Sequence, residues 1–182
     1  YFDKETGPIV VKASGLAAGK GVILCSNSAE GLNAVDTIMK DKSFGEAGDQ
    51  VVIEEFLEGQ EVSVLAFSDG NTVLLMDSAQ DHKAALDGDK GPNTGGMGAY
   101  SPAPIFTDIL RHKVRNTIML PLVRAMKSEG RPYKGILYAG LMLTKNGPKT
   151  LEFNARFGDP ETQPLLVRME SDIVPLFEAC ID

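Results

Sequence analysis

The segment Lys149-Thr-Leu-Glu-Phe-Asn-Ala-Arg156 is the most informative part of the chain, because its apolar and polar residues alternate as they do along a β-strand. The two-residue period of a strand gives this segment one apolar face and one polar face. The apolar face carries Leu151, Phe153 and Ala155, and the polar face carries Glu152, Asn154 and Arg156. We therefore expect one face to pack on the core and the other to carry chemistry.

The polar face of this predicted strand combines metal-binding and anion-binding groups. The carboxylate of Glu152 beside the amide oxygen of Asn154 suits a hard cation such as Mg²⁺. The guanidinium of Arg156 next to them suits a phosphate or acyl-phosphate oxygen. The alternative is a half-exposed edge strand whose polar residues have no chemical role.

Composition indicates a globular protein, with 43% hydrophobic and 24% charged residues among 182. The formal net charge of −7 argues against a nucleic-acid partner. The apolar stretch 136–143 is too short to span a bilayer, so we expect no membrane partner.

Cys25 and Cys180 have no metal-type spacing, which is typical of a reduced, cytoplasmic protein. Because a strand follows Tyr1 so closely, we expect an excised piece of a longer polypeptide.

The first part of the chain, residues 1–76, predicts a small α+β lobe. Asn27 and Glu30 form a capping-box pattern ahead of a short amphipathic helix that ends near Lys40. Asp69-Gly70 predicts a hairpin turn. Apolar patterning predicts strands at 8–12, 22–25, 51–55, 62–67 and 73–76.

The remaining residues, 77–182, predict a larger lobe. From 77 to 104 helix and strand periodicity disappears and glycines gather, so we expect a long loop with a functional role. Its segments 78–83 and 91–98 mix acidic, basic, amide and hydroxyl groups on a backbone that can approach a ligand closely. His82, as a lone histidine, is more often structural than catalytic.

Regular elements return after this loop. Residues 107–129 have the apolar spacing of a long buried helix. The strands 135–143 and 150–156 are expected to form a hairpin, because Lys145-Asn-Gly147 between them is a strong turn signal. A last helix is expected to begin at Ser171-Asp172.

A glycine-rich loop between the first two predicted strands has the character of a phosphate cradle. It contains Gly15, Gly19, Lys20 and Gly21, and it follows Lys12 at a strand end. It differs from a Walker A motif, since Lys20 precedes a glycine and no helix follows the loop. Lysines and backbone amides must therefore supply the positive potential for phosphates. The alternative is an ordinary flexible hairpin.

A second candidate nucleotide-binding segment is the strand end Ile53-Glu-Glu-Phe-Leu57, which runs into a turn before Glu61. Backbone groups at such a strand end are placed to meet the edge of a base, and an acid beyond them is placed to accept ribose hydroxyls. A solvated acidic turn is the alternative, and these residues taken alone favour it.

Four motifs together resemble one enzyme family. They are Val10-Val-Lys-Ala-Ser-Gly-Leu-Ala-Ala-Gly-Lys-Gly-Val22, Gln80-Asp-His-Lys83, Gly91-Pro-Asn-Thr-Gly-Gly-Met-Gly-Ala-Tyr-Ser-Pro102 and Leu151-Glu-Phe-Asn-Ala-Arg-Phe-Gly-Asp-Pro-Glu161. They look like the ATP-grasp portion of the phosphoribosylamine–glycine ligases, also called glycinamide ribonucleotide synthetases, and the resemblance covers essentially the whole chain. The third motif is specific to that family, whereas the glycine loop and the Glu152 and Asn154 pair are shared across ATP-grasp ligases.

The resemblance implies an α+β ATP-grasp fold. This fold has two α+β lobes, here 1–76 and 77–182, with largely antiparallel sheets and the nucleotide site between them. The complete enzyme of the family also has N-terminal and C-terminal domains that are absent from this chain. We therefore expect the chain alone to bind ATP weakly and to ligate little or nothing.

The activity implied by the resemblance is ATP-dependent ligation of glycine to 5-phosphoribosylamine in de novo purine biosynthesis. The reaction runs through glycyl phosphate and gives glycinamide ribonucleotide, ADP and phosphate. The implied cofactors are ATP and Mg²⁺, with Mn²⁺ as an alternative metal, and fusion to other purine-biosynthesis domains is a further expectation. The competing interpretations are a nucleotide-binding module without turnover, another ATP-grasp carboxylate–amine ligase, and a biotin-dependent carboxylase.

The resemblance also implies roles for individual residues. ATP is expected to contact Lys12, Gly15, Gly19, Lys20, Gly21, Glu54, Glu55, Leu57 and, at the ribose, Glu61. Mg²⁺ is expected on Glu152 and Asn154, and the other substrates on Asp81, Lys83, Asn93, Thr94, Arg156 and Asp159. Lys20 and Arg156 are the expected catalytic residues. Many ATP-grasp enzymes place a further metal-binding carboxylate where this chain has Gly140, Leu141 and Met142, so the number of metal ions stays open.

Overall fold

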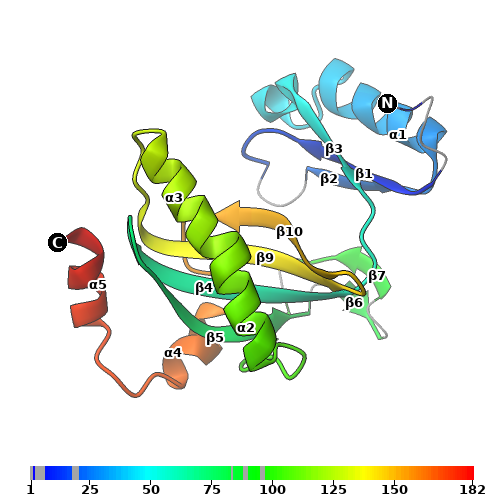
Figure 1. The fold of residues 1–182 in the computed structure, drawn as a ribbon. Coiled ribbons are helices and arrows are strands. Elements are labelled where there is room, and N and C mark those ends of the chain that lie inside the picture. Colours follow the sequence, from blue (N-terminus) through cyan, green and yellow to red (C-terminus); the bar gives the residue numbers. More distant parts are fainter. Residues whose placement is uncertain (1, 3–6, 18–20, 83, 88–89, 95–96) are drawn as a thin grey trace. The chain divides into compact units, whose positions relative to one another are not determined.

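The computed structural model describes residues 2, 7–17, 21–82, 84–87, 90–94 and 97–182, with the backbone alone at 84 and 90–93. The chain divides into two compact units, Tyr1–Leu57 and Glu58–Asp182, and each has its own sheet and core (Figure 1). Both units combine helices with antiparallel strands. The predicted α+β class is confirmed.

The first unit is a three-stranded antiparallel sheet with helices packed on one face. The strand order is β2 (Val22–Cys25), β1 (Ile9–Ala13), β3 (Val51–Glu55), so the predicted hairpin across the glycine loop is confirmed. Helix α1 (Ser28–Val35) continues as a π-helical turn, Asp36–Lys40, and a 3₁₀ turn spans Gly45–Asp49. The buried core consists of Ile9, Val11, Cys25, Ala34 and Ile38.

The start of α1 is fixed by a capping box. The Asn27 Oδ1 atom accepts a hydrogen bond from the backbone N–H of Glu30 at 3.0 Å, which satisfies a donor that has no partner within the helix. The Glu30 carboxylate in turn accepts from the backbone N–H of Ser26 at 2.8 Å. The sequence predicted the beginning of this helix from Asn27 and Glu30, and that prediction is confirmed.

The second unit is built on a five-stranded antiparallel sheet in the order β10-β9-β4-β5-β8. Its strands are β4 (Gln60–Asp69), β5 (Val73–Asp81), β8 (Ala99–Tyr100), β9 (Lys134–Thr144) and β10 (Gly147–Asn154). A separate ribbon pairs β6 (Ala84–Leu86) with β7 (Lys90–Asn93). Every residue of 62–68, in the central strand β4, is buried, because helices cover both faces of the sheet.

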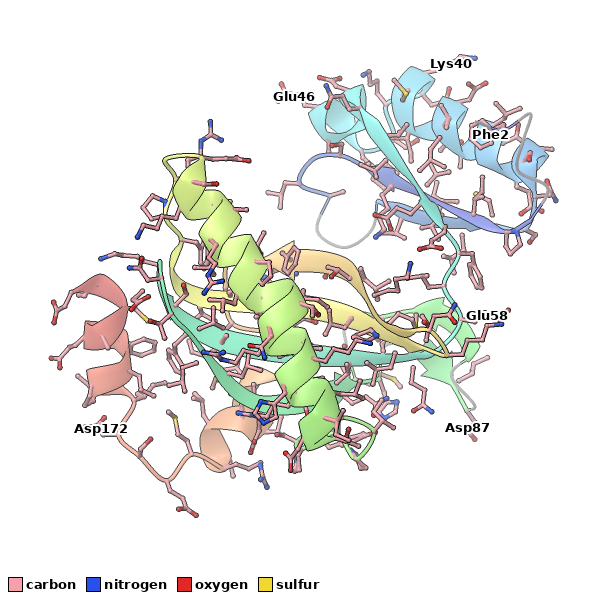
Figure 2. The ribbon with its side chains drawn as sticks, viewed as in Figure 1. Phe2, Lys40, Glu46, Glu58, Asp87 and Asp172 are labelled. Atoms are coloured by element: carbon pink, nitrogen blue, oxygen red, sulfur yellow. The ribbon has the colours of Figure 1, made fainter. Side chains whose placement is uncertain are left out.

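One long helix lies across one face of this sheet, and two short helices lie against the other (Figure 1). The long helix comprises α2 (Asp108–Val114), a π-helical stretch, Arg115–Met119, and α3 (Leu120–Ser128), as predicted for 107–129. The short helices are α4 (Thr162–Val167) and α5 (Val174–Ile181). Asp172, which Figure 2 shows in the segment joining them, accepts a hydrogen bond from the Val174 N–H at 3.0 Å.

Strand alternation divides the core of the second unit into two layers. The layer under the long helix includes Val62, Val64, Ala139 and Leu141. The layer under α4 and α5 includes Leu65, Phe67, Ile136 and Tyr138. Any residue of β10 can therefore be placed in a layer from its partner on β9.

Two sequence predictions differ from the structure. The units divide at Leu57 and Glu58, not at 76 and 77, because β4 pairs with β9 along its whole length and with β5. The long loop expected at 77–104 contains the end of β5 and all of β6, β7 and β8, which are too short to show side-chain periodicity. None of the helices in the described ranges has the length and apolar character needed to cross a membrane.

Candidate functional site

The polar face of β10 carries Glu152 and Asn154 side by side. Glu152 lies opposite Gly140 and Asn154 lies opposite Tyr138, so both side chains are on the sheet face covered by α4 and α5. The Nδ2 group of Asn154 donates a hydrogen bond to Glu152 Oε1 at 3.0 Å. The structure thus brings the two predicted metal-binding side chains together.

The opposite face of β10 departs from the predicted pattern at two points. A β-bulge between Thr150 and Glu152 takes Leu151 out of the alternation. Phe153 lies on the core side of the sheet as predicted, opposite Ala139 in the layer under the long helix, yet the residue is 40% exposed. It borders an apolar cavity of about 180 Å³ that Ala155 and residues of α3 also line. The apolar face of the strand is therefore only loosely packed at this end.

The donor set of the polar face fits a hard divalent cation. Mg²⁺ is usually held by one or two carboxylates, with phosphate oxygens and water in the remaining positions. Glu152 supplies a carboxylate, and Asn154 supplies an amide oxygen once its amide group flips. In the part of the chain that the structure describes, no group of three or more His, Cys, Asp and Glu side chains is arranged to hold a metal. The pair is therefore suited to a cation that takes its remaining ligands from phosphate oxygens and water.

Strand β9 adds no carboxylate to this face. Positions 140 and 142 of β9, occupied by Gly140 and Met142, are on the same sheet face as Glu152. Leu141 points to the opposite face and is fully buried. Glu61 of β4 lies opposite Met142, so it belongs to the same face as Glu152. A predicted ribose-binding acid and the predicted metal-binding pair thus share one face of one sheet.

Arg156 follows β10 and lies beside Tyr138. Its Cζ atom is 6.0 Å from the centre of the Tyr138 ring, within the range of a cation–π contact. Its Nη1 group donates a hydrogen bond to the Phe157 carbonyl oxygen at 2.7 Å. The side chain is exposed, and a guanidinium has five N–H donors, so several remain for an anion.

A buried polar cluster, Ser63, Tyr138 and Glu161, adjoins this face, and the sequence analysis did not predict it. Ser63 Oγ and Tyr138 OH contact Glu161 Oε1 at 2.7 and 3.0 Å and lie 2.9 Å from each other. Burial raises the pKa of the Tyr138 hydroxyl, and the negative charge of Glu161 raises it further, so this hydroxyl stays protonated. The available signal was a serine and a tyrosine within otherwise apolar strands.

The residues predicted to bind phosphoribosylamine lie on separate segments of the second unit. Asp81 ends β5 and pairs with β8, Thr94 follows β7, and Asp159 lies in the exposed turn after Arg156. Lys83 lies outside the described residues, and Asn93 is described by its backbone alone. The convergence of these residues on one ligand stays a prediction.

In the first unit, Lys12 and Glu54 lie on the sheet face opposite to the core. Lys12 Nζ and Glu54 Oε2 form an ion pair at 2.6 Å, and both side chains are partly buried. Val22 and Val52 lie on either side of Lys12 in the strand register and are 45% and 43% exposed. This face is an apolar platform with one ion pair, which suits a planar ring and a charged group. The two predicted hinge residues beyond it are Glu55, the last of β3, and Leu57, the last of the unit.

The structure describes the glycine loop in part. A Cβ atom on Gly15 would lie 2.6 Å from the Ala47 Cα atom, so only glycine allows this approach of the two backbones. The last N–H of β1 donates to the Gly21 carbonyl oxygen at 2.8 Å, which closes the hairpin. Gly19 and Lys20 lie outside the described residues, so the predicted catalytic role of Lys20 has no structural counterpart here.

Comparison with known proteins shows that the fold is that of the ATP-grasp enzymes. A solved biotin carboxylase domain from Hydrogenobacter thermophilus, in complex with MgADP and bicarbonate, matches with a TM-score of 0.66 at 20% identity, over 95% of this chain and 36% of that chain. This likeness shows the fold alone. A family model described as phosphoribosylglycinamide synthetase, ATP-grasp (A) domain, matches residues 1–162. The chain belongs to that family.

Relatives with much higher identity agree with this family. A phosphoribosylamine–glycine ligase of Rhodopirellula baltica is 57% identical over the whole chain, which spans 42% of that relative. The trifunctional purine biosynthetic protein adenosine-3 of Gallus gallus is 59% identical over 96% of the chain and 17% of that protein. The crystal structure of phosphoribosylamine–glycine ligase from Thermotoga maritima has a TM-score of 0.80 at 36% identity, covering 91% of this chain and 42% of that one. The chain thus spans less than half the length of each relative.

Proposed function

We propose that this chain is the ATP-grasp part of an enzyme that ligates glycine to 5-phosphoribosylamine and converts ATP to ADP and phosphate. The family match over residues 1–162 supports this activity. The observation that carries the proposal is the polar face of β10, where Glu152 and Asn154 are in contact and Arg156 follows within two residues. The proposed product is glycinamide ribonucleotide, an intermediate of purine biosynthesis.

Two displacement steps account for the ligation. A carboxylate oxygen of glycine attacks the γ-phosphorus of ATP, the bond to the bridging oxygen of ADP breaks, and glycyl phosphate forms. The amine nitrogen of phosphoribosylamine then attacks the acyl carbon, the nitrogen loses a proton, and phosphate leaves. Both steps move negative charge among oxygen atoms, so positive groups fixed in advance supply most of the catalysis.

In the second unit, the proposed site residues hold the reacting phosphate and the glycine. Glu152 and Asn154 hold Mg²⁺, which when bound neutralises phosphate oxygens. Arg156 binds the glycine carboxylate and the acyl phosphate, because its planar guanidinium can donate to two oxygens at once. Glu61, on the same sheet face as Glu152, accepts hydrogen bonds from ribose hydroxyls. We propose Mn²⁺ as an alternative metal, since it accepts the same oxygen ligands.

The remaining predicted residues complete the proposed contacts. Lys12 and Lys20 bind phosphates, and Gly15, Gly19 and Gly21 have no side chain to keep the loop backbone away from them. Glu54, Glu55 and Leu57 line the adenine, for which the exposed apolar platform beside Lys12 is suited. Phosphoribosylamine contacts Asp81, Lys83, Asn93, Thr94 and Asp159.

We also propose a cytoplasmic location, which the two free cysteines, Cys25 and Cys180, support. The name of the Gallus gallus relative describes a trifunctional protein. We propose fusion to other purine-biosynthesis domains as one of two arrangements for this chain, the other being a ligase alone. The length of the full polypeptide distinguishes these arrangements.

The proposed activity is tested by turnover of the full-length protein that carries this chain. We expect ADP release that requires both glycine and phosphoribosylamine. ADP release stimulated by bicarbonate or another acid instead of glycine would identify a different ATP-grasp enzyme. ATP binding without ADP release would identify a binding module. Either of the last two results refutes the proposed ligase.

The metal-binding face is tested in the same assay with Glu152→Ala. Loss of a ligand to the cation removes several kcal/mol of charge stabilisation, so we expect turnover to fall by about 100-fold or more. Glu178→Ala is the matched control, because Glu178 is an exposed carboxylate on α5 and should leave turnover unchanged. Wild-type turnover in Glu152→Ala would rule out its proposed role at the metal.

A further inference from the structure

Ser63, Tyr138 and Glu161 form a polar cluster inside an apolar layer of the second unit. Ser63 comes from β4, Tyr138 from β9, and Glu161 from the turn before α4. They are 5%, 5% and 2% exposed, and all three distances between their oxygen atoms are 3.0 Å or less. The surrounding layer contains Leu65, Phe67, Ala79, Ile136 and Leu165.

Stability alone does not account for a carboxylate in this position. Burying a charged group is costly, and hydrogen bonds from two hydroxyls only offset that cost. Apolar residues of similar volume in such positions are often as stabilising as a buried polar group or more so. The contacts of the cluster with the residues around Arg156 indicate a role at the candidate site.

The cluster is joined to the candidate site on both sides of Arg156. Before Arg156, the Tyr138 ring lies opposite Asn154 in the strand register and 6.0 Å from the Arg156 Cζ atom. After Arg156, the chain turns and reaches Glu161 within five residues. Tyr138 therefore contacts the guanidinium through its ring and Glu161 through its hydroxyl, so one side chain connects the two.

The turn between Arg156 and Glu161 is shaped around the buried carboxylate. A Cβ atom on Gly158 would lie 2.4 Å from Glu161 Oε2, so the lack of a side chain at Gly158 leaves the space that the carboxylate fills. The Thr162 N–H donates to the Gly158 carbonyl oxygen at 3.2 Å, and the Leu165 N–H donates to the Glu161 carbonyl oxygen at 3.3 Å. The carboxylate is therefore fixed both by its hydroxyl partners and by its own backbone.

We propose that the cluster of Ser63, Tyr138 and Glu161 positions the Arg156 guanidinium on the sheet face that carries Glu152 and Asn154. Tyr138 and Glu161 are positioning residues that act through Arg156. This inference rests on the proposed function, because it gives Arg156 a task that requires accurate placement. A guanidinium on a freely rotating side chain can bind an anion, but it does not fix the orientation of that anion. Phosphoryl transfer requires the reacting groups to be aligned.

The first test compares Tyr138→Phe with Tyr133→Phe in the full-length protein. Tyr138→Phe keeps the ring and removes the hydroxyl that contacts Glu161. Tyr133→Phe is the matched control, because the Tyr133 side chain packs in the layer under the long helix, on the other face of the sheet from Tyr138, and its hydroxyl donates to the Ile136 carbonyl oxygen. We expect kcat to fall about tenfold in Tyr138→Phe, with the KM for ATP within twofold of wild type, and no change in Tyr133→Phe. Equal kcat values in the two variants would overturn the proposal.

A double-mutant cycle separates positioning from a general structural effect. If Tyr138 acts through Arg156, the tenfold loss should disappear when Tyr138→Phe is made in an Arg156→Ala background. An undiminished tenfold loss in that background would show that Tyr138 acts independently of Arg156 and would refute the proposal. Glu161→Gln should retain more turnover than Glu161→Ala, because the amide oxygen still accepts hydrogen bonds from the hydroxyls.

A crystal structure of the full-length Tyr138→Phe variant tests the inference without relying on turnover. We expect the Arg156 guanidinium to leave its place beside the ring at position 138. An unchanged guanidinium position would refute the positioning role even if the ligase activity is confirmed. Absence of glycine-dependent ADP release from the wild-type protein would refute the proposed function, while the crystallographic result would still decide the positioning role.

Discussion

The substitution Gly158→Ala tests how firmly the Glu161 carboxylate is held in its position. A Cβ atom at this position would lie 2.4 Å from Glu161 Oε2 and 2.8 Å from its Cδ atom. Favourable contact requires about 3.5 Å, so the carboxylate must move by about 1 Å. In an exposed glutamate such a movement would cost little, but here Ser63 and Tyr138 hold the carboxylate within a buried layer.

The cost of that movement follows from the two hydrogen bonds. Their lengths of 2.7 and 3.0 Å would rise beyond the normal range after a shift of this size. Hydrogen bonds to a charged group contribute about 1.5–3 kcal/mol each, and partial relaxation should preserve some of that energy. We expect Gly158→Ala to lower the free energy of unfolding by about 3 kcal/mol, which corresponds to a fall in Tm of about 6–12 °C for a chain of this size.

Differential scanning calorimetry of the wild-type chain and the variant measures this change in the transition of the unit Glu58–Asp182. Glu178→Ala is the control, because Glu178 is an exposed residue of α5 in the same unit. Its effect should stay within about 0.5 kcal/mol, as for most surface substitutions. A loss of less than about 1 kcal/mol in Gly158→Ala would show that the carboxylate moves freely and would refute the argument for a tightly held cluster.

Three further predictions concern the site and the stability of the chain. Arg156→Lys keeps the charge but loses the planar pair of donors, so turnover of the full-length protein in the ADP-release assay should fall about tenfold or more without a change in Tm. Leu65→Ala opens a cavity at a fully buried position, and urea unfolding should show a loss of about 3 kcal/mol. In the folded chain, hydrogen bonds from the backbone N–H groups of Thr72 and Asn71 lower the Asp69 pKa below 3.8, so the carboxylate stabilises the fold above that pH. Asp69→Asn should therefore reduce stability at pH 7, and its deficit relative to wild type should shrink as unfolding is measured at pH values falling below 3.8.

Elements specified by neighbouring residues could be predicted from the sequence. The start of α1 depends on Asn27 and Glu30, three positions apart, and the β9–β10 hairpin depends on the turn at Lys145-Asn146, directly before Gly147. The contact between Glu152 and Asn154 follows from the period of a single strand. In each case the determining interaction lies within a few residues, so a local pattern contains it.

Features that depend on distant residues could not be predicted in this way. Ser63 contacts Tyr138 and Glu161 across separations of 75 and 98 residues, and no local pattern joins them. The strand β4 is buried on both faces, so it lacks the alternation that would reveal its pairing with β9. That pairing moved the boundary between the units to Leu57 and Glu58.

The bulge at Leu151 shifts the pairing of β10 with β9 by one residue within a short strand. Residues 147–150 continue the ladder set by the tight turn, and Glu152 resumes it one step out of phase. If the pairing stayed regular from the turn onward, Glu152 would lie opposite Ala139. Its carboxylate would then point into the apolar core layer under the long helix. The one extra residue at the bulge thus decides which sheet face each later side chain of β10 points to. The residues at the hairpin turn can therefore change without moving Glu152 and Asn154 to the other face.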